Sequence, residues 1–440
     1  MKKREQEKFE ELTEDFATQP VPGDVTTNGY HIALINSGLV ISWLTMVTGV
    51  LFGLAIGVMN TIYVTLISSA FLVVVGIIAG IVGSKTRLSS YMLMKFSFGA
   101  KGALLINLVL AISLLGWFGV TLDLLGDGAQ ALAQQEFNFL LPKWLWMLIG
   151  GVLITTTSIF GFRGLNRLAP WLTPIMALVM VVVVYKVFQM TSLAELMAFE
   201  GTGEISIGVA ISASIGSLIS MMIAMPDFTR YVKTPFDSVV ATFFPLLIAQ
   251  PLVYTGAAIA AVATQQYDLL LIMIEVGLGL FAFILIVAST WISNAIALYS
   301  CSLGLASVLV KVKKWKLEVL SGVVGTLMAI AGIMDYFIVF LESLSFIFVP
   351  IGSVYLSDYY FISKQNYEFE KIADGSPVSI PAMLAMLIGI AVYYGSSTEL
   401  CAITPLPAVD SLVVTTLVYL LSKHLGAKYY RNVVEESVAD

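Results

Sequence analysis

The chain has 440 residues, of which 58% are hydrophobic and only 12% charged, with a formal net charge of −6 and a mean hydropathy of +0.91. Soluble domains are roughly 45–50% apolar and about 25% charged, so the composition excludes a soluble globular protein and indicates an integral membrane protein. Repeated apolar windows of about twenty residues favour helical spans over a barrel, whose strands would alternate. The charges lie in loops and tails, so the acidic balance does not point to nucleic-acid binding.

The first thirty residues are polar and carry Lys2, Lys3 and Arg4 ahead of several acidic residues. They lack the short apolar core of a cleavable signal peptide, so residues 1–30 are predicted to form a cytoplasmic tail. The hydropathy pattern then predicts about twelve helical spans of the usual length of roughly twenty residues. They cover residues 32–58, 61–84, 102–126, 144–161, 169–190, 206–226, 237–263, 271–309, 317–334, 336–361, 379–396 and 405–422. The eighth is too long for one straight span and is expected to include an interfacial extension.

Loop charges predict the orientation of these spans. With the N-terminus inside, the lysines and arginines fall in cytoplasmic segments, and Lys143 and Lys186 are the exceptions. The positive-inside rule requires this asymmetry. It predicts an even number of spans, both termini in the cytoplasm and a multi-pass protein of the cell's inner (plasma) membrane.

Two of the predicted spans are rich in residues that weaken a helix. The first carries Gly49, Gly53 and Gly57, and the sixth contains a dense run of small hydroxyl residues from Ser212 to Ser220. Weakened helices in corresponding positions of two halves indicate an inverted-repeat transporter with its binding site at the bilayer midplane. The alternative is ordinary close packing, because Gly and Ser also allow membrane helices to approach one another.

The third span contains a tryptophan between two glycines, in the run Gly116-Trp117-Phe118-Gly119. A large flat ring beside open backbone is suited to stacking against a planar ligand, since the glycines would let the ligand approach closely. The alternative is one more packed aromatic in a membrane helix.

Several segments resemble the cytosine permeases, in the purine and pyrimidine permease branch of the nucleobase–cation symporter family. They are Asp15 to Ala17 followed by Pro20 to Pro22, Lys95 to Gly99, Gly116 to Val120, Asp227 to Arg230, and Pro350 through Tyr359. The resemblance covers residues 15 to about 360 in order. It implies an all-α polytopic fold of the LeuT type, a five-plus-five inverted repeat followed by two peripheral helices, and alternating access driven by a cation gradient.

The resemblance also implies substrate-binding positions. The family's stacking tryptophan corresponds to Trp117, and its sixth-span serines correspond to Ser217 and Ser220. These side chains and their backbone are expected to stack on and hydrogen-bond a heterocycle.

Three positions depart from cytosine permeases. Leu114 replaces a glutamine, Leu218 replaces an aromatic residue, and Ser289 replaces an asparagine. A site that hydrogen-bonds the polar edges of its ligand discriminates strongly, because a lost partner leaves a buried group unpaired. The replacements argue against cytosine itself and favour another planar heterocycle, bulkier or more apolar.

The cation site of the family is altered as well. Family members place hydroxyls at two adjacent eighth-span positions, which here are Ile292 and Ser293. With first-span oxygens around Ser42 to Thr45, these hydroxyls can hold sodium, because hard cations prefer oxygen ligands. Ser293 and Thr45 are therefore the candidate sodium ligands, with one side-chain oxygen missing.

Three acidic residues fall in or beside apolar runs. Carboxylates at membrane depth are expensive and mark ion pathways or proton relays. Glu275 and Asp123 are expected to face the outer interface. Glu342, in the tenth span, replaces a hydroxyl residue of the cytosine permeases and is the candidate for proton coupling, slightly favoured here over sodium.

The sequence therefore predicts a secondary active transporter that imports a nucleobase-like or pyrimidine-like heterocycle by proton or sodium symport. An amino-acid or osmolyte symporter of the same fold is the alternative. No enzyme is expected, because the chain has only two histidines and no paired acidic metal motif. No organic cofactor and no nucleic-acid partner are expected, only a small-molecule substrate, membrane lipid and a monomeric state. The predicted units are 31–190 and 206–361 for the two repeats and 362–440 for the peripheral helices and C-terminal tail.

Overall fold

The computed structural model describes residue 16 and residues 19–159, 161–267, 269–275, 277–374, 376–398 and 400–439. Within these residues the regular structure is helical, and one isolated bridge between Thr27 and Val232 is the sole β contact. Eight of the described helices are long and apolar enough to cross a membrane. The predicted all-α polytopic membrane fold is confirmed.

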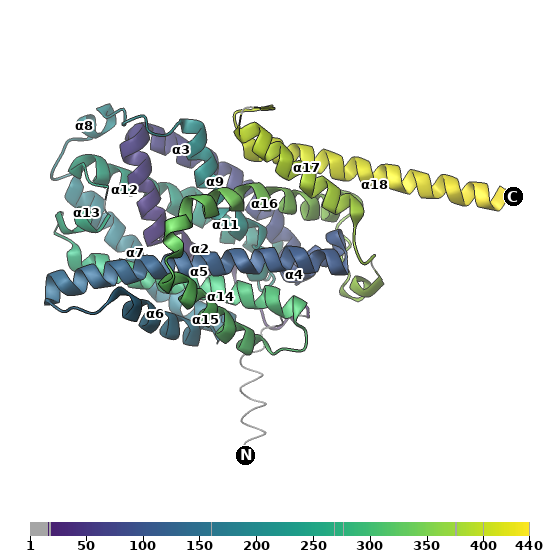
Figure 1. Cartoon of the computed structure of the whole chain (residues 1–440), viewed down its shortest axis with the longest axis horizontal. Coiled ribbons are helices and arrows are strands. Elements are labelled where there is room, and N and C mark those ends of the chain that lie inside the picture. Colours follow the sequence, from purple (N-terminus) through teal and green to yellow (C-terminus); the bar gives the residue numbers. More distant parts are fainter. Residues whose placement is uncertain are drawn as a thin grey trace, which may run out of the picture.

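The first half of the chain contains the long helix α5, which crosses the whole bundle (Figure 1). Its elements are α2 (Gly29–Val40), α3 (Trp43–Thr86), α4 (Ser90–Phe98), α5 (Ala100–Phe137), α6 (Lys143–Ser158), α7 (Gly161–Val187) and α8 (Leu193–Ala198). The helix α3 joins the first two predicted spans, because Gly57 in its middle has a φ of +79° and bends the chain between them.

The second half begins with α9 (Ile207–Ile223), α10 (Pro226–Thr229), α11 (Pro235–Phe243), η1 (Phe244–Ala249), α12 (Gln250–Thr264), α13 (Leu269–Glu275) and α14 (Gly279–Val308). It continues with α15 (Lys314–Ile330), η2 (Ile333–Tyr336), α16 (Phe337–Ser357), η3 (Asp358–Ile362), η4 (Phe369–Asp374), α17 (Ile380–Ser397) and α18 (Pro407–Ala439). The overlong eighth span is the short helix α13 followed by α14. Two predicted spans correspond to α6 and α15, of 16 and 17 residues, so the count of twelve crossings and the two repeat ranges stay predictions.

Both predicted interruptions exist, but they lie away from the residues that suggested them. The first separates α2 from α3 at Ile41 and Ser42, where the Ser42 hydroxyl accepts a hydrogen bond from the Thr45 amide and caps α3. The second separates α9 from α10 at Ala224 and Met225, just before Pro226. The run from Ser212 to Ser220 is continuous helix. The expectation that this run marks the break is therefore wrong by several residues.

The glycines of the first span serve helix packing. A Cβ atom on Gly53 would lie 2.5 Å from the Cα of Ala258, and one on Gly49 would lie 2.8 Å from the carbonyl oxygen of Tyr254. Both neighbours belong to α12, so these glycines let α3 and α12 meet backbone to backbone. The alternative stated for the glycines thus holds at Gly49 and Gly53.

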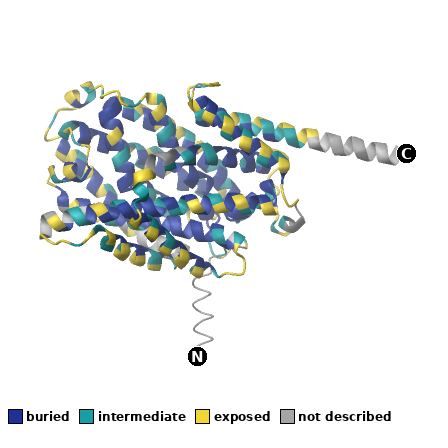
Figure 2. Cartoon of the chain, viewed as in Figure 1, coloured by how far each residue is buried: buried dark blue, intermediate teal, exposed yellow. Residues whose placement is uncertain are grey.

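The helices differ in how far they are buried, and an internal site requires helices from the buried centre of the bundle. In the central 286–306 stretch of α14, 83% of the most apolar window is buried in the protein, against 28% in α18. Figure 2 shows the same gradient, with buried residues concentrated in the bundle and α17 and α18 packed along one edge. The site is therefore expected where α14 meets the two interrupted helices.

Candidate functional site

An internal cavity of about 90 Å³ lies where both helix breaks meet α5 and α14. Its lining residues are Leu39, Ser42, Leu44, Thr45, Thr48, Leu114, Trp117, Thr121, Ser217, Leu218, Ser220, Met221, Ala224, Phe228, Tyr254, Ser293, Asn294, Ile296, Ala297 and Ser300. Seven residues predicted from the sequence are among them: Thr45, Leu114, Trp117, Ser217, Leu218, Ser220 and Ser293. None of these described lining residues carries a formal charge. The cavity can therefore hold a small neutral molecule without burying an unpaired protein charge.

Trp117 presents a half-buried ring to this cavity from α5. Its ring packs edge-to-face on Phe340 of α16, with centroids 5.5 Å apart and planes at 73°. A Cβ on Gly116 would lie 2.6 Å from the Phe340 ring, and one on Gly119 would lie 3.2 Å from Ile333. The flanking glycines thus admit neighbouring helices, and the expectation that they open the backbone to a ligand is wrong. The part of the Trp117 side chain that lines the cavity is the part that a stacked ligand would contact.

The α9 side of the cavity alternates polar and apolar groups. The Ser217 hydroxyl donates to the Ser214 carbonyl over 2.9 Å and lies 3.4 Å from the Tyr254 hydroxyl. Leu218 is buried, and Leu114 reaches the same space from α5. The wall beside Trp117 is therefore more apolar than an amide-lined site would be.

Two polar residues of the cavity, Thr121 and Asn294, were not predicted from the sequence. The Thr121 hydroxyl donates to the Trp117 carbonyl over 2.7 Å and also contacts the Asn294 side-chain oxygen closely. The Asn294 amide nitrogen is buried with no hydrogen-bond partner among the described residues. The threonine hydroxyl has one proton to donate. If it donates to the Asn294 oxygen, the amide nitrogen is left unpaired; if it donates to the Trp117 carbonyl, a flipped amide donates to the hydroxyl oxygen and its own oxygen is left unpaired. An amide inside an apolar span is the signal that could have identified it.

The candidate sodium ligands lie at the same cavity. The Thr45 hydroxyl is 2.7 Å from the Ser42 hydroxyl, and the Ser293 hydroxyl is buried without a hydrogen-bond partner. Ile292 is buried against α2, where a Cβ on Gly38 would lie 3.0 Å from its terminal methyl group. The position of a second eighth-span hydroxyl is thus filled by hydrocarbon that seals α14 against α2.

Ser289 does not line the cavity. It is fully buried and its hydroxyl accepts a hydrogen bond from the Trp43 amide over 3.1 Å, which holds the start of α3 against α14. Ser289 therefore acts as a contact between helices.

Two of the three acidic residues singled out from the sequence, Asp123 and Glu275, do not line the cavity. Asp123 is buried, but it forms an ion pair with Lys143 at the start of α6, 2.6 Å away. Glu275 is exposed on α13. Glu342 falls on α16, and its side chain lies outside the described residues.

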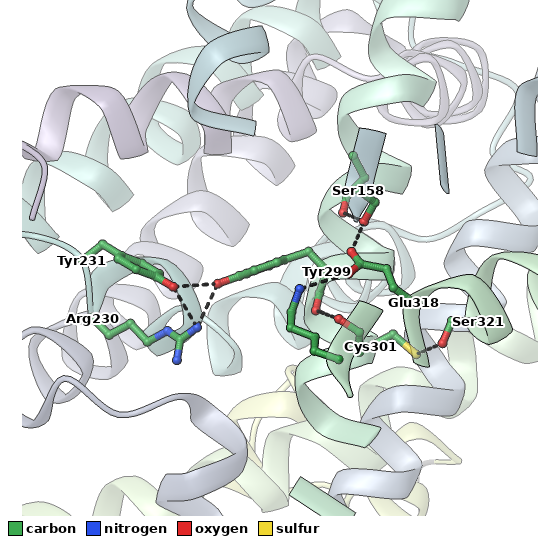
Figure 3. A network of polar contacts seen from close by, with 10 residues as sticks. Ser158, Arg230, Tyr231, Tyr299, Cys301, Glu318 and Ser321 are labelled. Atoms are coloured by element: carbon green, nitrogen blue, oxygen red, sulfur yellow. Dashed lines mark hydrogen bonds and ion pairs between the residues drawn. The ribbon is translucent and has the colours of Figure 1, made fainter. Parts of the chain in front are cut away.

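A buried polar network begins just beyond the Phe228 and Ser300 end of the cavity (Figure 3). The Arg230 guanidinium, fully buried, donates to the Tyr299 hydroxyl over 2.9 Å and to the Phe16 carbonyl over 2.8 Å. The Lys314 ammonium lies 4.7 Å from the centroid of the Tyr299 ring and pairs with Glu318 over 3.0 Å. The network ties α10 and the N-terminal segment to α14 and α15 near this end of the cavity.

The fold and the site together define a class. An all-helical membrane protein with two interrupted helices beside a central cavity has the organisation of a secondary transporter.

Similarity to known proteins identifies the family. The chain matches the family model described as permease for cytosine/purines, uracil, thiamine, allantoin over residues 25–419. It is 28% identical to the cytosine permease of Escherichia coli K12 over 378 residues, which cover 86% of this chain and 88% of that protein. The chain therefore belongs to this permease family, and it is a transporter and not an enzyme.

Solved structures agree on the fold. Mhp1, a nucleobase-cation-symport-1 family transporter, in a closed conformation with bromovinylhydantoin bound, superimposes with a TM-score of 0.83 at 18% identity, covering 94% of this chain and 96% of that one. The inward-facing conformation of Mhp1 gives a TM-score of 0.79 at 18% identity, with 94% of each chain covered. At this identity the likeness concerns the fold alone.

Proposed function

We propose that this permease imports a planar, nucleobase-like or pyrimidine-like heterocycle together with a cation. The observation that carries the proposal is the Trp117 ring and the Asn294 amide, whose nitrogen has no hydrogen-bond partner, in the wall of one uncharged cavity. A flat heterocycle offers a π-face to the indole and polar edges to an amide, and both contacts contribute to its affinity. The likeness to the cytosine permease of Escherichia coli supports this substrate class.

The apolar lining narrows the proposed substrate. Leu114 and Leu218 offer no hydrogen bond to the exocyclic amine or carbonyl of cytosine, so a polar edge placed against them would lose its partner. We therefore propose a heterocycle bulkier or more apolar than cytosine. An amino acid is the weaker candidate, because its ammonium group would find no carboxylate among the described lining residues.

The coupling ion is proposed to be a proton. A sodium ion at Ser293 and Thr45 would have one side-chain oxygen fewer than in the family, since Ile292 is buried against Gly38. Ligand number largely determines the affinity for hard cations, so its loss weakens sodium binding. Glu342, predicted from the sequence to lie at membrane depth, supplies a group that can carry the proton.

The remaining features of the proposal concern placement. We propose a monomer in the inner membrane with both termini in the cytoplasm, as the asymmetry of lysine and arginine predicts. The network around Arg230 then lies on the cytoplasmic side of the cavity.

Uptake competition tests the substrate class. A radiolabelled nucleobase that the cells accumulate is challenged with excess unlabelled nucleobases, vitamin precursors, hydantoins and amino acids. Planar heterocycles are expected to compete and amino acids are not. Competition by amino acids alone would show that the substrate class is wrong.

A further inference from the structure

A second cavity, of about 630 Å³, lies on the outer surface of the bundle between α3, α9, α16 and α18. Its wall is apolar and includes Phe71, Val74, Ile78, Ile223, Leu356 and Leu412. The polar groups in the wall are largely satisfied internally, since the Tyr360 hydroxyl donates to the Ile78 carbonyl and the Ser357 hydroxyl to Thr416. We name this feature the α3–α18 groove. It offers hydrocarbon and few free hydrogen-bonding groups to an occupant.

The groove runs along one face of α3. Phe71, Val74, Ile78 and Ile81 recur at helical spacing, and Val74 is 57% exposed, so the groove opens outward where lipid surrounds the protein. At a rise of about 1.5 Å per residue, the stretch from Phe71 to Ile81 is roughly 15 Å long. That length equals about one leaflet of a hydrocarbon core roughly 30 Å thick.

Three segments that line the groove each continue to a lysine, at positions 85, 364 and 423. Lys85 continues the groove-facing stripe of α3, and its ammonium donates to the Gln365 side-chain oxygen over 2.7 Å, next to Lys364. On α18, Lys423 follows Leu412 and Thr416 along the same stripe. The Lys423 ammonium lies 5.6 Å from the centroid of the Tyr419 ring.

These lysines have no ion-pair partner in the described part of the chain. One buried carboxylate of this region is Asp358, which starts η3. It already accepts hydrogen bonds of 2.5 Å from the hydroxyls of Tyr367 and Tyr419. The positive charge at the end of the groove is therefore available to an anion.

We propose that the α3–α18 groove binds an anionic phospholipid. One acyl chain lies along the Phe71 to Ile81 face, and the phosphate lies among Lys85, Lys364 and Lys423. This end is the predicted cytoplasmic side, where the leaflet carries anionic lipid and juxtamembrane lysines add affinity.

The groove also touches a helix of the substrate cavity. Ile219 and Ile223 of α9 line the groove, while Leu218 and Ser220 of the same helix line the cavity around Trp117. A lipid in the groove would thus pack on the back of α9. Lipid binding does not depend on the nature of the transported substrate, so its test is separate from the uptake assays.

Native mass spectrometry of the full chain tests the proposal. The purified protein is mixed with equal amounts of phosphatidylglycerol and phosphatidylcholine, and the retained lipids are counted. Replacing Lys85, Lys364 and Lys423 by Gln should reduce the preference for phosphatidylglycerol by roughly fivefold for each lysine removed. The Arg versions of the three positions should keep the preference.

Matched variants serve as controls. Lys101, Lys311 and Lys316 are exposed and outside the groove, so their triple change to Gln should leave the preference intact. Val74→Trp fills the groove and should remove the bound lipid, whereas Val152→Trp, at a valine 58% exposed on α6, should not.

Three results would overturn the proposal. The first is an unchanged lipid preference in the Gln variant of Lys85, Lys364 and Lys423. The second is displacement of the lipid by inorganic phosphate with no effect of Val74→Trp, which would indicate a phosphate site alone. The third is a shift between monomer and dimer in Val74→Trp, which would indicate that a second copy of the chain occupies the groove.

Discussion

Trp117 is the residue on which substrate binding is expected to depend most. Stacking of a base on an aromatic side chain contributes roughly 1–3 kcal/mol, so Trp117→Ala should reduce affinity for the substrate about five- to a hundredfold. The measurement is initial uptake against substrate concentration, normalised to inserted protein. Trp291→Ala is the control. Trp291 is also half-buried, but its indole nitrogen donates a hydrogen bond to the Thr157 hydroxyl and it does not line the cavity. Equal affinity in Trp117→Ala and the wild type would contradict stacking.

Selectivity is expected to depend on Leu114 and Leu218. Cytosine should bind the wild type poorly, and Leu114→Gln with Leu218→Phe should raise its affinity roughly two- to tenfold, the range of a net contribution of about 0.5–1.5 kcal/mol from a buried hydrogen bond. Leu115→Gln, next to Leu114 in the sequence but not among the lining residues, should have no such effect. The measurement is competition by unlabelled cytosine, and tight cytosine binding by the wild type would show that this description of the pocket is wrong. Ser289→Asn should not add to this effect, because Ser289 is buried against Trp43.

The difference between Ser289 and Asn294 shows what residue patterns can and cannot predict. Spacing along a helix predicts which residues of that helix share a face. Trp117 of α5 and Ser217 and Leu218 of α9 do reach one cavity, as predicted. It does not predict where another helix crosses that face. The start of α3 covers Ser289, while Asn294, a little more than one turn further along, reaches the cavity. Contacts between distant segments decide such cases.

At the scale of whole helices, the buried pair of Lys314 and Glu318 is expected to be sensitive to the loss of either partner. Both side chains are almost fully buried, and Glu318 also accepts a short hydrogen bond from Ser158 of α6. Lys314→Met would leave the Glu318 charge unpaired, and removing one partner of a buried pair costs roughly 3–5 kcal/mol. The double change Lys314→Met with Glu318→Leu should recover much of the loss. Thermal unfolding in detergent measures both, and a double variant less stable than Lys314→Met would contradict this account.

The helix interruptions show why patterns at this scale predict the right element but the wrong position. Gly49, Gly53 and the serine run suggested weakened helices, and both helices are indeed interrupted. Gly49 and Gly53, however, pack directly against the backbone of α12, and the serine run is continuous helix. The first break follows from the Ser42 cap and the second precedes Pro226. A single sequence does not distinguish small residues that allow two helices to pack closely from small residues that accompany a break in a helix.

At the scale of the whole molecule, composition and hydropathy predict most of the architecture. The all-helical membrane fold follows from apolar windows, because only helices and closed barrels satisfy their backbone in lipid. The network that joins Arg230, Tyr299 and Lys314 was not predicted, since its members lie in three separate segments and meet only in the folded chain. Because the network lies near one end of the cavity, opening the cavity on that side would require contacts in this region to rearrange.

The choice of coupling ion is a property of the whole transporter, and we predict it from positions 292 and 293. Ser293 offers an unpaired hydroxyl, but Ile292 replaces the second oxygen that a sodium ion would need. Uptake into proteoliposomes should therefore be driven by a pH gradient, inside alkaline, and not by a sodium gradient at equal pH. Glu342→Gln should abolish the proton-driven component, whereas Glu275→Gln, at an exposed position on α13, should not, and Ser293→Ala should leave it largely intact. Uptake driven by sodium alone, insensitive to a protonophore and unaffected by Glu342→Gln, would exclude proton coupling and make Ser293 a sodium ligand.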